Sequence, residues 1–122
     1  MSAFSAHSNN FVNTNDVTFS FIQYNEGNDY NATTGVFTCR IPGVYWFSAT
    51  LLGSSDGVCY FLLNGSAKVY IGYPGGNYDT GTASQVLRLR HGDRVQVGHC
   101  YKPYTLPSDS LDSFSGVLVK AD

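Results

Sequence analysis

The segment Gly43–Ala49, with the sequence GVYWFSA, constrains more than any other how this chain can fold. Its aromatic and β-branched residues favour a strand, and side chains alternate between the two faces of a strand. Tyr45 and Phe47 therefore point to one face, while Val44 and Trp46 point to the other. A sheet face exposed to water carries mainly polar side chains. We therefore expect the second face to be covered, and another copy of the chain is the simplest cover.

Length and composition predict a single domain over residues 1–122. The chain is 43% hydrophobic and 13% charged, which suits one core and leaves no room for a second domain. Its net charge of −2 argues against nucleic-acid binding, and no apolar run could insert into a membrane. The opening residues MSAF lack the features of a signal peptide. Two alternatives stay open at this point: a cytosolic protein, or a secreted one whose signal has been removed.

Short β-type segments follow one another along the chain, and none has helical periodicity. Turn-forming residues separate them, most clearly Asn64-Gly65, where both residues tolerate positive φ in a tight hairpin. Many short strands with frequent turns predict an antiparallel sandwich or jelly roll. The expected strands are Val17–Tyr24, Gly35–Arg40, Gly43–Leu52, Val58–Leu63, Ala67–Tyr73, Gln85–Leu89, Arg94–His99 and Phe114–Val119.

Three arginines lie close together around the segment His91-Gly92-Asp93, which we interpret as the turn of a second hairpin. In such a hairpin Arg88, Arg90 and Arg94 would share one outward-facing stripe. Guanidinium groups there suit anionic ligands such as sialic acids or acidic polysaccharides. A solvated face, or pairing with acidic residues of a neighbouring copy, is the alternative.

The spacing of the aromatic residues resembles the signature of the globular head of complement component 1q. Further blocks resemble the later parts of that family in the same order, so the resemblance covers nearly the whole chain. The matching residues are Phe19, Asn25, Tyr30, Phe37 and Gly43-x-Tyr45-x-Phe47, then Asn64-Gly65, Leu87-Arg88-Leu89-x-x-Gly92-Asp93-x-Val95 and Phe114-Ser115-Gly116-x-Leu118, with Ala3-Phe4-Ser5-Ala6 resembling the opening strand.

The resemblance implies a ten-stranded antiparallel jelly-roll sandwich, similar to that of tumour necrosis factor, assembled as a compact homotrimer. In that architecture the strand of Tyr45 and Phe47 belongs to the sheet that faces the neighbouring subunits. Val44, Trp46 and Val117 are then the expected interface residues. The resemblance also implies a secreted, extracellular protein. The Gly-x-y repeats of a collagen-like stalk do not occur in this sequence.

The chain has three cysteines, an odd number that leaves one over if two are bonded. Cys39 and Cys59 match the intradomain pair of the complement chains, so the resemblance implies a disulfide between them. Cys100 would then be a free thiol or an intermolecular link. The alternative is that all three cysteines are reduced and buried.

Two further features concern metals and modification. No cofactor is expected to be required, but the resemblance implies a candidate calcium site at Asp79, although Thr80 stands where the family has a companion Gln. An aspartate that merely solvates a loop is the alternative. The triplets Asn31-Ala32-Thr33 and Asn64-Gly65-Ser66 match the N-glycosylation acceptor pattern.

We expect a binding protein and not an enzyme, because the histidines are isolated and no nucleophile elbow occurs. The resemblance implies an innate-immune recognition protein, lectin-like, that binds carbohydrate such as sialic acid or microbial glycans. The alternative is a secreted trimeric signalling or organiser ligand that binds a protein receptor. Besides Arg88 and Arg90, the candidate ligand-binding residues are Tyr101, Lys102 and Tyr104, in a long irregular connection.

Overall fold

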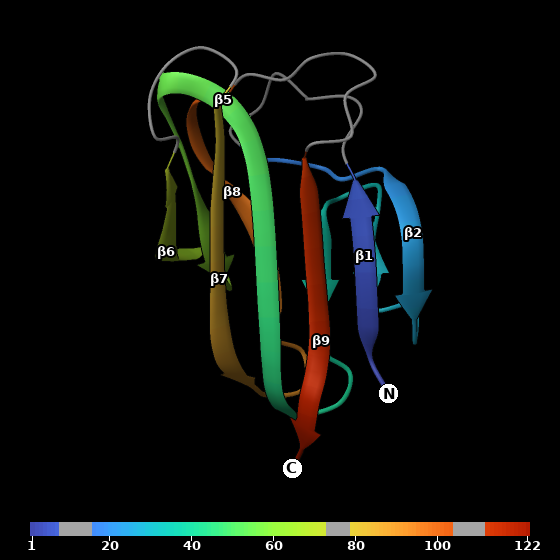
Figure 1. The fold of residues 1–122 in the computed structure, drawn as a ribbon. Helices are drawn as coiled ribbons and strands as arrows, with labels where there is room; N and C mark the ends of the chain where they lie inside the picture. The colour runs from blue at the N-terminus through green and yellow to red at the C-terminus, as the bar shows by residue number, and fades with distance from the viewer. Residues whose placement is uncertain (8–15, 73–78, 104–111) are drawn as a thin grey trace.

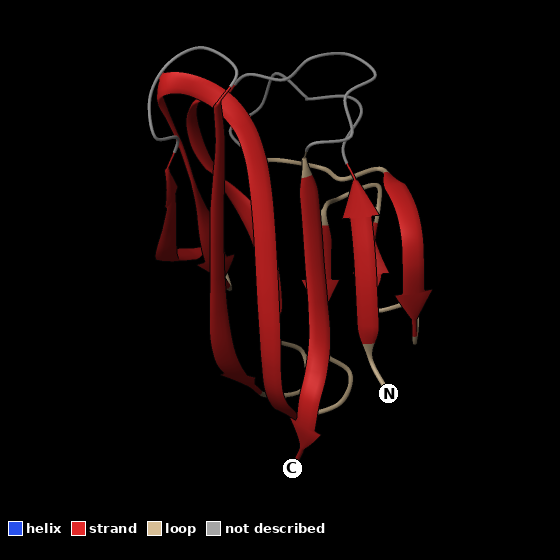
Figure 2. Ribbon diagram, viewed as in Figure 1, coloured by secondary structure: helices blue, strands red, loops and turns tan. Residues whose placement is uncertain are grey.

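A computed structural model of the chain describes residues 1–7, 16–72, 79–103 and 112–122. For residues 52–57, 72, 79, 80 and 101–103 it describes the backbone and not the side chains. The described residues form strands, turns and loops, with no helix among them (Figure 2). None of these residues, therefore, belongs to a helix that could cross a membrane.

The strands of the described part of the chain, in order, are β1 (Ala3–His7), β2 (Phe21–Glu26), β3 (Tyr30–Asn31), β4 (Val36–Thr38), β5 (Gly43–Leu63), β6 (Ser66–Gly72), β7 (Asp79–Leu89), β8 (Arg94–Pro103) and β9 (Ser113–Ala121).

Both sheets are built around β5. Its first half pairs with β7 and β9, and its second half pairs with β6 and β8. The first sheet therefore has the order β2-β1-β9-β5-β7, and the second has the order β6-β5-β8-β4-β3. With each half of β5 counted, the described residues form the predicted jelly roll of two five-stranded antiparallel sheets. In Figure 1 the green ribbon of β5 bends over at the top of the view and passes from one sheet to the other.

Several strand boundaries differ from the prediction. Residues 54–57 were expected to form a turn, but the backbone stays extended through them and joins the two expected strands into β5. The strand expected from Val17 begins only at Phe21, and Val17 lies beside β8, where its N–H donates to the carbonyl of Val97 at 3.0 Å. The short strand β3 was not predicted.

The second predicted hairpin is wrong. Strands β7 and β8 are consecutive, but no ladder pair joins them in the described structure, and they belong to different sheets. The turn between them crosses the sandwich, and Cys39 anchors it by accepting a hydrogen bond from Gly92 N–H and donating one to the Asp93 carbonyl, both at 2.8 Å. Arg88 and Arg94 therefore lie on the outer faces of opposite sheets and share no stripe.

The core lies between the two sheets and is rich in aromatic rings. Tyr45 and Phe47 are fully buried, as the alternation in the sequence predicts. The Phe4 ring stacks on Tyr30 with 4.7 Å between centroids and meets Phe114 edge-on at 4.9 Å. Such offset and edge-on contacts add to the stabilisation that comes from burial alone. The inward-facing side chains of both sheets thus form one continuous core.

Candidate functional site

The outer face of the first sheet carries an exposed apolar patch. Trp46 on β5 lies opposite Val86 on β7 and Val117 on β9, so the three form one row across three strands. Trp46 is 43% exposed and Val86 is 64% exposed, and Val119 nearby is 62% exposed. Val44 and Val117 are half-buried. We call these five residues the apolar row; it contains Val44 and Trp46, which were predicted to lie on the second face of the Gly43–Ala49 strand, and adds Val86 and Val119, which were not among the predicted interface residues.

Hydroxyl side chains extend this face beyond the apolar row. Thr50 and Thr82 share a hydrogen bond of 3.0 Å between their hydroxyls, and Ser115 donates one of 3.2 Å to Ser5. Because serine and threonine side chains are short, a second protein molecule could approach the backbone of this sheet closely. At the other end of the apolar row, Val44 lies between Arg88 and Lys120, so the first sheet offers an apolar band with charged side chains on one side and hydroxyl groups on the other.

The outer face of the second sheet has a different character. Tyr60 on β5 lies opposite Tyr70 on β6, and their rings meet edge-on with centroids 5.8 Å apart. The Tyr70 ring is 62% exposed. On the other side Tyr60 lies opposite Gly98 on β8, where an added Cβ would come within 2.9 Å of Leu62. Leu62 is buried on this face, outside the main core. The surface beside the tyrosine pair is therefore well packed.

A small cavity lies further along the same face. It has a volume of about 240 Å³ and is lined by Val36, Gly65, Arg94 and Gln96. Arg94 and Gln96 supply a guanidinium group and an amide, while Val36 supplies an apolar wall. Typical pockets for drug-sized ligands are about 300–1,000 Å³. This cavity is therefore smaller than a typical ligand pocket and suits a small group.

The turn that carries Gly65 is held rigidly beside this cavity. Asn64 and Gly65 both have positive φ, 51° and 87°, as predicted for the hairpin. The Asn64 side chain accepts a hydrogen bond of 2.9 Å from the N–H of Arg94 and donates one of 3.1 Å to the Asp93 carboxylate. The Arg90 N–H donates to the same carboxylate at 2.8 Å, and this bond, together with the one from the Asn64 amide, lowers the pKa of Asp93.

The residues predicted to bind ligand do not form one cluster in the described structure. The Arg88 guanidinium donates to the Asp122 carboxylate at 2.6 Å on the first sheet, while Arg90 is exposed beyond the end of β7. Tyr104 lies outside the described residues. Tyr101 and Lys102 belong to β8, but their side chains are not described.

The candidate calcium ligand is also outside what the structure describes in full. Asp79 begins β7, and its side chain is not described. Within the described part of the chain, no three His, Cys, Asp or Glu residues lie close enough together to hold a metal ion.

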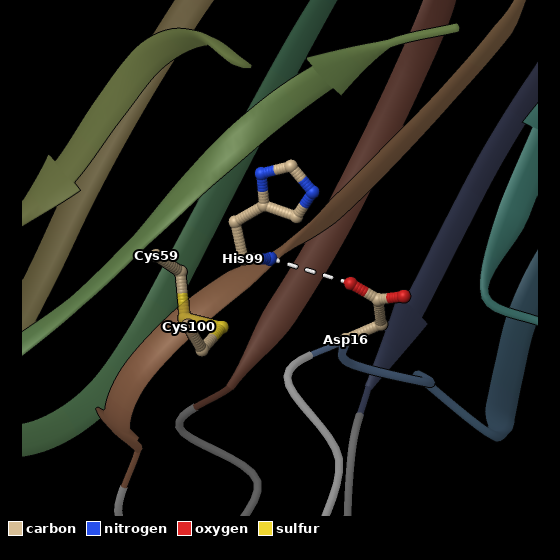
Figure 3. The surroundings of a disulfide bond; sticks show 4 residues. All are labelled: Asp16, Cys59, His99 and Cys100. Carbon is tan, nitrogen blue, oxygen red and sulfur yellow. Dashed lines mark hydrogen bonds between the residues drawn. A yellow bond between two sulfur atoms is a disulfide. The ribbon is translucent and has the colours of Figure 1, made fainter. Parts of the chain in front are cut away.

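The predicted Cys39–Cys59 disulfide is wrong. Cys59 on β5 is bonded to Cys100 on β8, with 4.1 Å between their Cα atoms (Figure 3). These two strands are neighbours in the second sheet, whereas Cys39 follows β4, on the far side of β8. Cys100 is therefore not the unpaired cysteine. The imidazole of His99 points away from the sulfur atoms (Figure 3).

Cys39 is the free cysteine, and it is buried. Its Sγ lies 3.3 Å from the carbonyl oxygen of Ile41 and 3.8 Å from the hydroxyl of Tyr45. Burial raises the pKa of the Cys39 thiol, so the reactive thiolate is disfavoured. Cys39 therefore acts as a small buried residue of the core.

Sequence reasoning missed the exposed tyrosine pair. Counting outward from the Asn64-Gly65 turn places Tyr60 opposite Val69 and not opposite Tyr70. The β-bulge between Phe61 and Leu62 changes that count by one residue. No signal in the sequence marks the bulge.

Comparison with known proteins agrees with the resemblance noted in the sequence. The C1q domain family matches residues 3–119. The chain is 34% identical over 116 residues to complement C1q tumor necrosis factor-related protein 2 of Mus musculus, covering 87% of this chain and 38% of that protein. It is 31% identical over 109 residues to a complement C1q subcomponent of Rattus norvegicus, covering 87% of this chain and 44% of that protein. The chain thus spans less than half the length of these relatives.

Solved structures show the same fold. The globular domain of zebrafish complement 1qA protein superposes with a TM-score of 0.73 at 23% identity, with all of both chains covered. Murine APRIL superposes with a TM-score of 0.72 at 14% identity, covering 94% of this chain and 95% of the other. Since the family match extends over almost all of the sequence and the jelly roll is the same, this chain belongs to the C1q domain family.

Proposed function

We propose that this protein is an extracellular recognition protein that assembles as a homotrimer and binds carbohydrate, such as sialic acid or microbial surface glycans. The observation that carries the proposal is the exposed Tyr70 ring, braced by Tyr60 on the same face as Arg94 and Gln96. An aromatic face stacks on the apolar side of a sugar ring, while guanidinium and amide groups bond its hydroxyls or carboxylate. Membership of a family that includes complement proteins supports an extracellular recognition role.

The apolar row supports self-association. A contiguous apolar patch that includes an exposed tryptophan is uncommon on a soluble monomer and marks an interaction surface. The row lies on the first sheet, so assembly through it would leave Tyr70 and Arg94 on the second sheet accessible. Three copies related by a closed rotation would each bury the same face.

The ligand surface can extend along β8. This strand carries Arg94 and Gln96 and continues through Tyr101 and Lys102. We propose that Tyr101, Lys102 and Tyr104 add contacts to a glycan longer than one sugar unit. Calcium is a candidate accessory ion through Asp79, and loss of glycan binding in a chelator would support that part of the proposal.

A glycan array probed with the purified protein tests the proposed function. We expect binding to anionic glycans that falls at least tenfold in Tyr70→Ala and in Arg94→Ala. Arg88→Ala is the matched control, because this arginine lies on the opposite sheet and is expected to leave binding within twofold. Equal binding by all three variants would place the site elsewhere.

A protein receptor is the second candidate partner, and one observation favours it. The edge strand β2 exposes Phe21, Ile22 and Tyr24, three large side chains that suit a protein interface. If the array stays silent while the protein binds cells in a manner abolished by Ile22→Glu and by mild proteolysis of the cells, the receptor function replaces the lectin function.

A further inference from the structure

The two acceptor triplets for N-linked glycans lie in different surroundings, and the structure distinguishes them. We propose that Asn31 carries an N-linked glycan and that Asn64 does not. This inference rests on the proposed extracellular destination, because only chains entering the secretory route meet the transferase. It concerns a modification of the chain and not its ligand site.

Asn31 presents its amide nitrogen for modification. The residue is exposed at the end of β3, in the turn that leads to β4. Its Oδ1 accepts hydrogen bonds from the N–H groups of Thr33 at 2.8 Å and Thr34 at 3.2 Å. Within the described part of the chain, its Nδ2 has no hydrogen-bond partner. The turn therefore uses only the oxygen of the amide, and Thr33, the third residue of the triplet, is also exposed.

Glycosylation at this nitrogen is compatible with the turn. Nδ2 attacks the anomeric carbon of a lipid-diphosphate-linked oligosaccharide; the new C–N bond forms, the bond to the diphosphate oxygen breaks, and Nδ2 loses one proton. The oxygen keeps its lone pairs, so the hydrogen bonds from Thr33 and Thr34 survive the modification. The turn can therefore keep both hydrogen bonds when the glycan is attached.

Asn64 is engaged at both ends of its amide. Its Oδ1 accepts from Arg94 N–H, and its Nδ2 donates to the Asp93 carboxylate at 3.1 Å. A sugar on Nδ2 would have to fit beside that carboxylate or displace it. The backbone of Asn64 is also fixed at positive φ by the hairpin. Modification of Asn64 would therefore compete with the turn that this residue builds.

The position of Asn31 in the fold suits a bulky modification. Strand β3 is the terminal strand of the second sheet, and one of its edges has no neighbouring strand in the described structure. A glycan there would shield this edge from pairing with another chain. It would stand apart from the apolar row, which lies on the first sheet.

The test is expression of the full chain in animal cells behind a heterologous secretory leader, followed by intact mass with and without peptide-N-glycosidase. The leader delivers the chain whatever its native destination. Probing the glycan array with protein made in bacteria, which carries no N-linked glycan, keeps failure here separate from failure of the proposed function. We expect a mass shift on enzyme treatment that disappears in Asn31→Gln and is unchanged in Asn64→Gln.

Thr33→Ala is the second variant. It removes the acceptor triplet but keeps Asn31, and the backbone N–H of residue 33 can still donate to Asn31 Oδ1. Loss of the shift in Thr33→Ala together with its retention in Ser66→Ala would support the proposal. A secreted parent without any shift, or a shift that depends on Asn64 and Ser66, would overturn it.

Discussion

The side-chain amide of Asn25 bonds both backbone groups of Tyr30, accepting from its N–H at 3.3 Å and donating to its carbonyl at 2.8 Å. A side chain thus takes the place that a neighbouring strand would occupy. The hydroxyl of Tyr30 in turn accepts from the N–H of Phe19 at 3.1 Å and donates to its carbonyl at 2.8 Å. Three aromatic-signature positions that looked independent in the sequence therefore form one hydrogen-bonded chain.

Tyr30→Phe should destabilise the fold by about 1–3 kcal/mol, because it leaves two buried backbone groups of Phe19 without their partner. Urea unfolding followed by fluorescence measures the change. Tyr24→Phe is the matched control: Tyr24 is exposed and its hydroxyl donates to the Glu26 carboxylate, so a change within about 0.5 kcal/mol is expected. Equal losses in both variants would contradict the role given to Tyr30.

The free energy of unfolding should depend on the ionisation of Asp93 at acid pH. Hydrogen bonds from Arg90 N–H and Asn64 lower its pKa in the folded state. Its contribution is therefore fully present above the unfolded value, about 3.9, and is lost as pH falls through the lower folded value. The difference in free energy of unfolding between the parent and Asp93→Asn should shrink as pH falls from about 6 to about 3. A difference that stays constant over this range would count against the assignment.

The three cysteines should become open to alkylation under different conditions. Native protein should resist alkylation, because Cys39 is buried and its thiol pKa is raised. Denaturant alone should expose one thiol, and reductant in denaturant should expose the remaining two. Peptide mapping without reduction should recover Cys59 linked to Cys100. A peptide linking Cys39 to either partner would show that the pairing is different.

Trp46→Arg should dissociate the proposed trimer, because a charge at the centre of the apolar row cannot be buried against another copy without a partner. Light scattering should give the trimer mass for the parent and the monomer mass for the variant, with unchanged circular dichroism. Tyr70→Arg makes the same kind of change on the opposite face and should leave the mass unaltered. A monomeric parent at micromolar concentration would end the trimer proposal.

The part of the fold that could be predicted from the sequence is the part that depends on the alternation of side chains along a strand. Alternation gives the face of a residue, so the burial of Tyr45 and Phe47 and the exposure of Trp46 were predictable. It does not give the neighbour of a strand. For that reason β7 and β8 were wrongly joined into a hairpin. The wrong partner for Cys59 came from the family resemblance, and only the pairing of β5 with β8 shows that Cys100 is its partner.

The candidate binding face depends on the same missing information. Tyr70 meets Tyr60 only through the register of β5 with β6, and a bulge shifts that register by one residue. Arg94 reaches its cavity only because β8 pairs with β4 and not with β7. Neither relationship has a local signal in the sequence.

The sharing of β5 between the two sheets has a consequence for how the molecule moves. Each sheet contains one half of β5, and the chain runs without a break from one half to the other, so we expect the two layers of the sandwich to open together. Backbone amides of both sheets should therefore exchange with deuterated solvent through one common opening, with similar protection. Because partners such as Ser5 and Ser115 stand 110 residues apart, reclosing after that opening should be slow.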